Sequence, residues 1–490
     1  MNRIIRLTIL VFAFFFPINS IYTEPREKDV LAAMRKAADF LANTVSNKGG
    51  YVFLYSEDLT RRWGEIPARD TQIWVQPPGT PAVGMMFLKA YKATGDHAYL
   101  DYAEKAANAL IWGQHPAGGW HYLIDFDMTG IRKWYDEAAS KCWGWEEYLQ
   151  YYGNCSFDDY TTSAPIRFLL ELYMTTLNPK YRTALLKAMD FILEAQYPNG
   201  AWPQRYPLRY DYPHDGHADY THYYTFNDDV ISDNINLLLE AWEKLGNETY
   251  REAAYRAMEF YIISQLPKPQ AGWAQQYTMN MKPGWGRSYE PDAVCTVQTT
   301  NNIRDLQKFY KITGDRRFLR PIPDALEWLE GAILTSGLPE GKTHAYFYEL
   351  GTNKPLWSHR SGTSIEDGHY WVDYNITNLY PYGVPLTIDI TQLKKEYERV
   401  CSLSSQEASA EYIASIQSSS KTVRIDSGII SEIIESLDSR GAWINDLSIP
   451  HYFGDVFNEP AESIRGINMS EFLQKMYTLI DYYAQNKSLH

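Results

Sequence analysis

Apolar residues recur at helical spacing in four related segments of the chain. Each segment reads as an amphipathic helix, a short turn of Gly, Asn or Asp and a second helix, and the first three close on a tryptophan. The segments are 88–120, 169–202, 238–273 and 306–332. Because such hairpins cannot bury their apolar faces alone, they must pack side by side. Their spacing leaves room for a long loop after each hairpin, which favours an α/α toroid over a tight solenoid.

The rest of the chain completes or covers this ring. A helix expected over 28–42 caps the hairpins, and a last helix, expected over 469–484, has one apolar face that docks back on them. Residues 343–385 are rich in Gly, Pro and aromatic residues, with strand-like alternation over 344–350. We therefore predict a mainly α fold, an incomplete α/α toroid of helix hairpins, with a small β-rich or loop segment over its cleft.

By composition the chain divides into three parts. Residues 1–22 have the pattern of a signal peptide, with Arg3 and Arg6 before an apolar run that is too short to span a bilayer. Residues 23–385 hold the toroid, and 386–490 form a more polar, mostly helical extension. We expect a secreted or periplasmic monomer that is not held in a membrane once the signal peptide is removed.

Composition argues against nucleic acid as a partner and is compatible with carbohydrate. The net charge is −14, and no run of Lys and Arg is long enough to follow a phosphate backbone. Aromatic residues reach 15%, which suits either stacking on sugar rings or a large helical core. The cysteines form no zinc-binding motif, whereas Cys142 and Cys155 are close enough in sequence to close a short disulfide loop.

Two acidic doublets precede predicted helices at matching places in successive repeats. They are Asp158-Asp159 and Asp228-Asp229. A single doublet of this kind is best explained by helix capping. Equivalent helix ends of a toroid line one mouth, however, so two doublets would bring together hard oxygen ligands of the kind that Ca²⁺ prefers.

Two arginines lie in loops that are rich in aromatic residues and glycine. Arg287 stands in Trp-Gly-Arg-Ser-Tyr-Glu-Pro, and Arg360 in Trp-Ser-His-Arg-Ser-Gly. Each guanidinium has the geometry to hold a sugar carboxylate through two hydrogen bonds. Taken alone, each is more simply explained as a surface side chain or as the partner of a nearby carboxylate.

A series of motifs follows in order between residues 155 and 385. They are Asp158 through Arg167-Phe168, Ala-Gln-Tyr-Pro-Asn-Gly-Ala-Trp-Pro-Gln-Arg-Tyr-Pro at 195–207, Thr-Phe-Asn-Asp-Asp at 225–229, Gly-Trp-Ala-Gln-Gln-Tyr at 272–277, Gly-Arg-Ser-Tyr-Glu-Pro at 286–291 and Phe-Tyr-Glu-Leu-Gly-Thr-Asn-Lys-Pro at 347–355. Together they resemble polysaccharide lyase family 10, the pectate lyases with an α/α toroid fold.

The resemblance implies a polysaccharide lyase that cleaves α-1,4-linked polygalacturonate, the acidic polymer of pectin, by β-elimination. In such a reaction a bound Ca²⁺ acidifies the C5 proton of the uronate. Asp158 and Asp228 match the calcium-binding aspartates. Asp159 and Asp229 are possible further ligands, and Arg360 matches the base. An arginine base needs a site that disfavours its charged form, because the pKa of an arginine side chain ordinarily lies above about 12.

The resemblance also implies contacts with the substrate. Arg287 matches an arginine that binds the substrate carboxylate. Three aromatic residues are expected against the sugar rings, namely Trp202, Trp273 and Tyr346.

Some positions depart from the family pattern. Tyr346 stands where the family usually has Arg, and Asp159 stands in place of the Asn of an Asp-Asn pair. Gln276-Tyr277 replaces a His-Asp pair, and the segment 212–220 is additional. Because these changes border the expected substrate cleft, they affect the choice of substrate more than the type of reaction.

Other functions remain compatible with the sequence. A lyase could act on another uronate polymer or on a partly esterified one, and the toroid could bind carbohydrate without catalysis. A hydrolase could use Asp158 and Asp228 as its acid and base. An unsaturated product would separate elimination from hydrolysis.

Overall fold

The computed structural model describes residues 25–141, 146–213, 216–361, 369–380, 383–418, 424–449 and 462–487. The predicted signal peptide lies outside these ranges, as does Cys142. Cys155 lies within them and carries a free, buried thiol. In the described part of the chain, no helix is long and apolar enough to cross a membrane.

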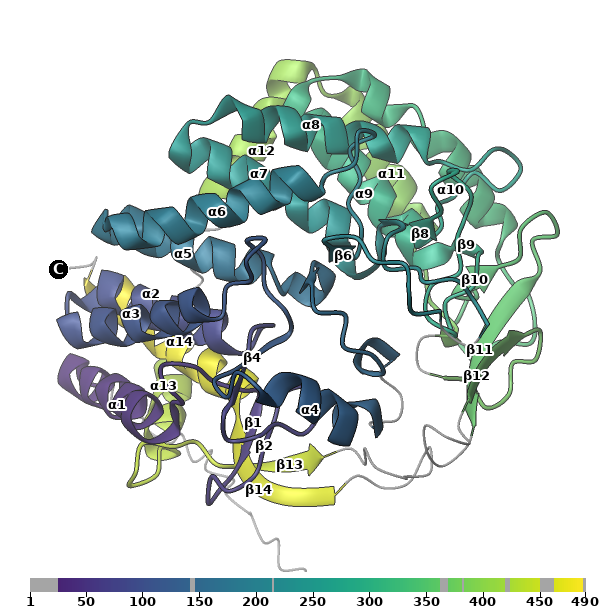
Figure 1. Ribbon diagram of the computed structural model, residues 1–490. Helices are drawn as coiled ribbons and strands as arrows, with labels where there is room; N and C mark the ends of the chain where they lie inside the picture. The colour runs from purple at the N-terminus through teal and green to yellow at the C-terminus, as the bar shows by residue number, and fades with distance from the viewer. Residues whose placement is uncertain are drawn as a thin grey trace, which may run out of the picture.

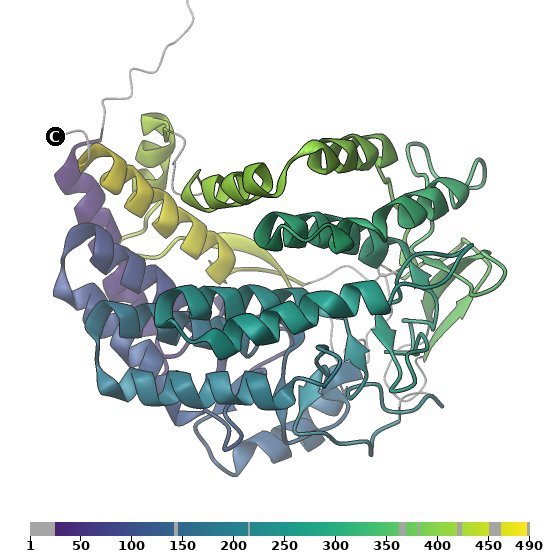
Figure 2. The ribbon, with the colours of Figure 1, turned by 90° about the horizontal axis from the view of Figure 1, so that it is seen from above.

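The protein is mainly α-helical, and its helix hairpins lie side by side in an incomplete α/α toroid, as predicted (Figures 1 and 2). Within each hairpin the two helices pack on each other, and α2 packs on α5, α5 on α7 and α8 on α9. The hairpin helices are α2 (Thr80–Thr94) and α3 (His97–Trp112), α5 (Ser163–Thr176) and α6 (Pro179–Ala195), α7 (Val230–Leu245) and α8 (Glu248–Ile263), and α9 (Thr296–Thr313) and α10 (Ile322–Gly331).

Most of the remaining helices pack at the two ends of the incomplete ring. The predicted first and last helices are present, and the last one packs against both the first helix and α2. Two others pack on α9 and α10 and lie behind the hairpins in Figure 1. These helices are α1 (Glu27–Phe40), α4 (Gly130–Glu137), α11 (Ile390–Ser402), α12 (Ser405–Ser418), α13 (Ser427–Glu435) and α14 (Met469–Lys487).

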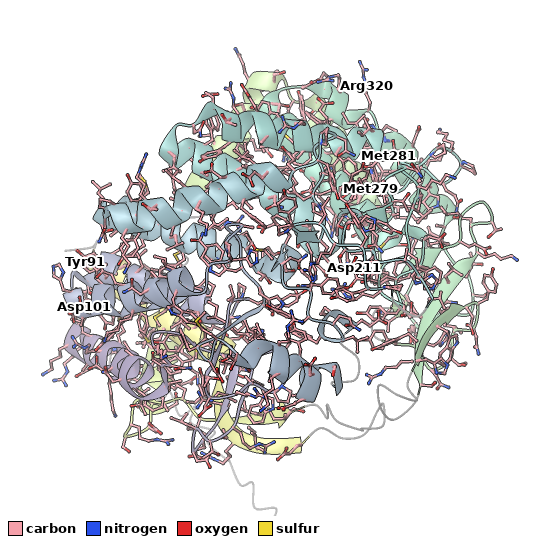
Figure 3. All side chains as sticks on the ribbon, viewed as in Figure 1. Tyr91, Asp101, Asp211, Met279, Met281 and Arg320 are labelled. Atoms are coloured by element: carbon pink, nitrogen blue, oxygen red, sulfur yellow. The ribbon has the colours of Figure 1, made fainter. Side chains whose placement is uncertain are left out.

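The four hairpin turns share one device. A residue with positive φ ends the first helix, and the Asp or Asn that follows it accepts a hydrogen bond from the backbone N–H two residues later. The capping residues are Asp96 (3.0 Å to Ala98), Asn178 (3.0 Å to Lys180), Asn247 (3.1 Å to Thr249) and Asp315 (2.9 Å to Arg317). Figure 3 shows Tyr91 and Asp101 beside the first of these turns, away from Asp211, Met279 and Met281 on the loops at the opposite helix ends.

The loop after each hairpin is pinned by a side chain that donates to a backbone carbonyl near the end of the second helix. Three of the pinning residues are the tryptophans that close the repeats, and Trp443 does the same after α13. The bonds are Trp120 to Leu110 (2.8 Å), Trp202 to Ile192 (2.8 Å), Trp273 to Tyr261 (2.9 Å) and Trp443 to Ile433 (2.9 Å). In the fourth hairpin, which lacks the tryptophan, Nε2 of His344 lies 2.9 Å from the Leu329 carbonyl oxygen.

Short antiparallel strands join the loops at one end of the helices. They form two four-stranded sheets, in the orders β13-β14-β1-β2 and β12-β11-β10-β9, and three strand pairs. The strands are β1 (Leu54–Ser56), β2 (Arg62–Trp63), β3 (Gln72–Trp74), β4 (Leu123–Asp125), β5 (Cys155–Ser156), β6 (Arg205–Tyr206), β7 (Tyr224–Thr225), β8 (Gln276–Tyr277), β9 (Val294–Cys295), β10 (Phe347–Tyr348), β11 (Pro355–Ser361), β12 (His369–Asp373), β13 (Asn445–Ile449) and β14 (Glu462–Asn468).

The predicted β element within 343–385 is therefore present, but most of it lies later than the alternation at 344–350 indicated. Only residues 347 and 348 of that stretch are a strand, β10. The longer strands are β11 and β12, which pair from Trp357 with Asp373 to Ser361 with His369. Burial over 344–350 does not alternate, because Ala345 and Phe347 are buried as well as His344 and Tyr348.

Candidate active site

Two equivalent loops deliver the acidic doublets to one end of the toroid. The strands β5 and β7 each pair with a strand of the next loop, β6 and β8. The phenylalanine after each strand, Phe157 or Phe226, is buried in the core. The backbone is thus anchored on both sides immediately before it turns into the next helix.

Both turns hold two consecutive non-glycine residues at positive φ. In the first they are Asp159 (47°) and Tyr160 (61°), and in the second Asp228 (52°) and Asp229 (58°). Such residues cost of order 1 kcal/mol or more each and concentrate at functional sites. In backbone conformation Asp159, and not Asp158, therefore corresponds to Asp228. Relative to the two turns, the acidic doublets are offset by one residue.

Three of the four predicted metal ligands come together. Oxygen atoms of Asp158, Asp159 and Asp228 all lie within 4.8 Å of one another. Asp158 is fully buried, and its Oδ1 has no hydrogen-bond partner among the described residues. Asp229 is outside the group, because its carboxylate is at the protein surface and accepts a hydrogen bond from Tyr160 at 2.9 Å. The structure therefore does not bring Asp229 to the other three aspartates, and its part in metal binding stays a prediction.

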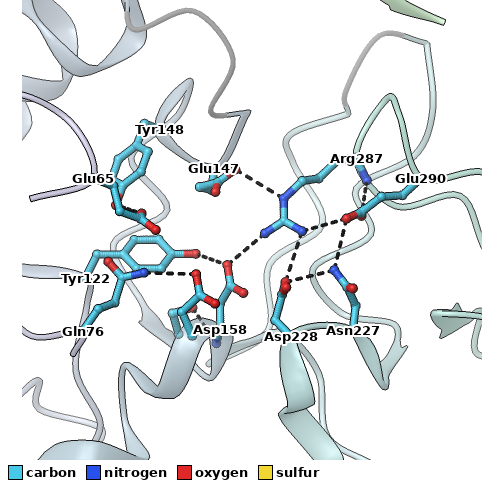
Figure 4. A network of polar contacts seen from close by, with 12 residues as sticks. Glu65, Gln76, Tyr122, Glu147, Tyr148, Asp158, Asn227, Asp228, Arg287 and Glu290 are labelled. Atoms are coloured by element: carbon cyan, nitrogen blue, oxygen red, sulfur yellow. Dashed lines mark hydrogen bonds and ion pairs between the residues drawn. The ribbon is translucent and has the colours of Figure 1, made fainter. Parts of the chain in front are cut away.

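The guanidinium of Arg287 lies at the centre of this acidic group (Figure 4). It is only 5% exposed. Its nitrogens donate to Glu147 (3.3 Å), Asp158 (2.9 Å), Asp228 (3.2 Å) and Glu290 (3.0 Å). Protein carboxylates therefore occupy the guanidinium that was predicted to hold a substrate carboxylate, and in this structure Arg287 serves as their shared counter-ion.

Two of the surrounding acids come from residues 126–155, an insertion between the first two hairpins that is rich in Trp and Tyr and that gave no sequence signal for the site. Glu147 contacts Arg287, and Glu146 accepts a 3.0 Å hydrogen bond from the backbone N–H of Ser288. On the far side Glu65 accepts a 2.6 Å hydrogen bond from Tyr148. One sequence feature could have indicated these acids: in 143–148 the two glutamates stand beside two tryptophans and one tyrosine. Buried glutamates need polar partners of this kind.

The carboxylates titrate as a crowded, buried set. Burial, and then the negative charge of Asp158, raises the pKa of Asp159 to about 7 and raises that of Asp228 well above its ordinary value. Burial also opposes ionisation of Asp158, but the Arg287 guanidinium and two hydrogen bonds hold its pKa below the usual range. Burial raises the pKa of Glu146 to about 7 and raises that of Glu147. One guanidinium is too little positive charge for this many acids.

A second buried arginine lies next to a tyrosine that contacts the acidic group. Arg205, in β6, is 1% exposed and lies between two tyrosine rings, 4.9 Å from the centroid of Tyr122 and 4.4 Å from that of Tyr152. Tyr122 in turn donates a 2.6 Å hydrogen bond to Asp158. The motif at 195–207 contributes to the site through this arginine.

Arg360, the predicted base, lies in β11 on the other side of a small tyrosine cluster. It pairs across the sheet with Tyr370, and its guanidinium carbon is 5.9 Å from the centroid of that ring. Tyr370 packs on Tyr289 at a ring distance of 4.8 Å. Because Tyr289 is two residues from Arg287, the cluster connects the two predicted arginines.

Part of the chain is similar to one known protein family. Residues 128–301 match the family model described as pectic acid lyase. This match confirms the resemblance to the pectic acid lyases. The enzyme class that follows from it is a polysaccharide lyase. Among curated proteins, none matches the chain.

Several solved structures are similar to the chain. A family 10 polysaccharide lyase from Cellvibrio cellulosa is 18% identical, with 66% of this chain and 98% of that chain covered and a TM-score of 0.43. A mutant of a family 10 lyase from the same organism, in complex with trigalacturonic acid, is 17% identical, with 64% and 98% covered and a TM-score of 0.43. A cellobiose 2-epimerase from Bacillus thermoamylovorans is 13% identical, with 93% and 98% covered and a TM-score of 0.42.

The pectic acid lyase region, residues 128–301, contains the acidic group and Arg287. Arg360 and Tyr346 lie beyond it. Tyr346 is half-buried beside Phe347, with a ring distance of 4.7 Å, and its carbonyl oxygen accepts a hydrogen bond from Thr296. A contact between Tyr346 and a sugar stays a prediction.

Two predicted contacts of this lyase with its substrate are wrong. The side chains of Trp202 and Trp273 are fully buried. Each indole N–H donates to a helix carbonyl, so each tryptophan pins a loop and offers no face to a sugar. Their regular place in the repeats therefore reflects the architecture of the hairpins.

The acidic group fits a divalent cation. Its donors are carboxylate oxygens, the hard ligands that Ca²⁺ takes in irregular arrangements. The buried Oδ1 of Asp158 has no hydrogen-bond partner in the part of the chain that the structure describes, which leaves an acceptor without compensation in the interior. The raised pKa values of Asp159 and Asp228 mark the same deficit of positive charge.

Proposed function

We propose that the chain is an exported pectate lyase that cleaves α-1,4-linked polygalacturonate by β-elimination. The observation that carries this proposal is the convergence of Asp158, Asp159 and Asp228 within 4.8 Å, inside the pectic acid lyase region. Two loops that are far apart in sequence are both held at positive φ to reach this arrangement. Helix capping alone would not require it, because an ordinary cap leaves its acid exposed at the helix end.

The three aspartates hold a Ca²⁺ ion in this proposal. When bound, the ion neutralises the substrate carboxylate and thereby acidifies the neighbouring C5 proton. Arg287 favours the ionised form of Asp158, and its hydrogen bonds hold both Asp158 and Asp228 in place. The acidic ligands are therefore arranged before the cation arrives, which lowers the cost of organising the site.

Arg360 is the group that we propose to accept the C5 proton. The atoms Nε and Nη2 of its side chain are buried. Its place in β11, held by five paired positions with β12, gives the side chain a rigid support. This role rests on the motif that includes residues 347–360.

A related activity is favoured by one observation. Glu147 next to Arg287 and Glu146 next to Ser288 both come from residues 126–155, and each adds negative charge beside the acidic group when it ionises. A polymer with fewer free carboxylates would be repelled less. A lyase on partly esterified pectin is therefore the second candidate.

The test is the full chain on polygalacturonate and on partly esterified pectin, followed by the ultraviolet absorbance of the unsaturated product. We expect activity that is lost with a chelator and restored by Ca²⁺. Arg360→Ala should abolish it, whereas the control Arg317→Ala, at an exposed arginine, should not. Products without unsaturation, or activity indifferent to both the chelator and Arg360→Ala, would contradict the proposal.

A further inference from the structure

A hollow lies against the loop that carries Arg287. Its volume is about 440 Å³, within the range of roughly 300–1,000 Å³ that small-molecule sites occupy. It is lined by Trp285, Pro291, Asp292, Glu349, Leu350, Leu356, Val372, Asp373 and Tyr374. Arg287 and Glu290 of the loop 285–292 thus belong to the acidic group, whereas the two ends of the same loop line this hollow.

An aromatic platform forms one wall. The indole of Trp285 is stacked on the imidazole of His217, with a centroid distance of 4.1 Å and an angle of 6° between the planes. His217 belongs to the segment 212–220, which is additional to the family pattern. Nε1 of Trp285 is buried and has no hydrogen-bond partner among the described residues. Tyr374, which also lines the hollow, is 54% exposed. Flat rings with polar edges are suited to the face of a sugar.

The charges of the hollow are unlike those of a uronate site. Its lining includes three carboxylates and neither lysine nor arginine. Two of the carboxylates are engaged, Glu349 with Tyr374 at 2.5 Å and Asp373 with His359 at 2.9 Å. Asp292 is exposed at the surface. One cation, Lys354, lies 5.3 Å from the centroid of the Tyr374 ring. A free carboxylate entering here would meet net negative charge.

We propose that this hollow is a subsite for an uncharged pyranose of the polymer. Trp285 and Tyr374 supply apolar contact with the ring, and Asp292 accepts hydrogen bonds from its hydroxyl groups. The uncharged unit is either a methyl-esterified uronate or a neutral hexose. This deepens the proposed function and rests on it, because the unit would belong to the same chain that is cleaved at the acidic group.

The experiment measures binding of three monosaccharides to the full chain by saturation-transfer NMR titration in the presence of a chelator. They are methyl α-galactoside, the methyl ester of methyl α-galacturonoside, and its free acid. None carries a 4-linked sugar, so none can undergo elimination. We expect saturable binding of at least one uncharged sugar and much weaker binding of the free acid. The sugar that binds identifies the source of the uncharged unit.

Variants locate the binding. Trp285→Leu should weaken it about fivefold or more, the scale of one aromatic contact. The control Trp112→Leu removes a 50% exposed tryptophan elsewhere and should leave it unchanged. Should Trp285→Leu fail to fold, Tyr374→Ala at an exposed position should give the same loss. Asp292→Lys should improve binding of the free acid.

The inference would be overturned if neither uncharged sugar showed saturable binding, or if the binding survived both aromatic substitutions. A free acid that binds best to the unmodified chain would also overturn it. The proposed function fails independently, when polygalacturonate and pectin yield no unsaturated product although the monosaccharides bind. Cleavage without such binding would reject the subsite alone.

Discussion

Nη2 of Arg287 lies 2.9 Å from Oδ2 of Asp158, although 129 residues separate them in the sequence. The same guanidinium also pairs with Glu147, Asp228 and Glu290. Four carboxylates from three separate loops therefore depend on one cation. Since buried acids without a counter-ion are costly, Arg287 holds these loops together as much as it tunes their chemistry.

Arg287→Met should destabilise the protein by about 3–5 kcal/mol, the cost of removing one partner from a buried ion pair. A bound divalent cation would supply part of the missing charge, so the loss should be larger with a chelator than with Ca²⁺. Chemical denaturation in both conditions measures the two differences. The control is Arg317→Met, at an exposed pair with Glu259, for which little or no loss is expected in either condition. Equal losses with and without Ca²⁺ would argue against a cation at this group.

Asp158→Asn and Asp229→Asn should differ in their effect on Ca²⁺ binding. Asp158 brings to the group of three a buried oxygen that none of the described residues contacts by a hydrogen bond, whereas Asp229 accepts a hydrogen bond from Tyr160 at the surface. Isothermal titration calorimetry with Ca²⁺ should show binding lost or at least about tenfold weaker for Asp158→Asn, since a carboxylate ligand is replaced by a neutral one. It should be nearly unchanged for Asp229→Asn. The reverse order would mean that Asp158, Asp159 and Asp228 are not the set of residues that binds the ion.

Trp202→Phe should reduce stability and leave substrate binding alone. The substitution leaves the Ile192 carbonyl without its donor and opens space in a fully buried site. Together these cost about 2–3 kcal/mol. KM for the cleaved polymer should stay the same in a variant that remains folded. A raised KM with unchanged stability would restore the sugar contact that the sequence indicated.

The helical part of the fold was predictable because it depends on local chemistry. An Asp or Asn after a residue with positive φ caps each second helix, and apolar residues at helical spacing identify both faces of a hairpin. The same regularity misled the interpretation of Trp202 and Trp273. A tryptophan that recurs at the end of a loop suits a sugar platform and a structural pin equally well in sequence. Only the partner of its indole N–H separates them.

The acidic group was predictable in part, since the doublets stand in matching loops. The sequence did not reveal that positive φ at Asp159 and Asp228 offsets the doublets by one residue. Nor did it indicate Glu147, because the contact of that residue with Arg287 joins an insertion to a loop 140 positions away. Contacts of this range depend on how the loops fold over the ring, which no local pattern records.

His121 should make the protein less stable as the pH falls below about 6.5. The side chain is packed among Tyr122, Tyr135 and Tyr151, and its Nδ1 is buried without a partner among the described residues. Burial, and then the nearby positive charge of Arg205, lowers its pKa well below 6.5.

In the unfolded chain the same histidine accepts a proton near pH 6.5. The unfolded state then binds more protons than the folded state, and stability falls with a slope of up to about 1.4 kcal/mol per pH unit between pH 6.5 and the lowered pKa. His121→Phe should flatten the free energy of unfolding over this window and change nothing in the slope above pH 7. His97→Phe, at an exposed position, should leave the slope as it is throughout. An unchanged slope in His121→Phe would show that another buried group causes the loss in acid, because a phenylalanine at this place cannot take up a proton.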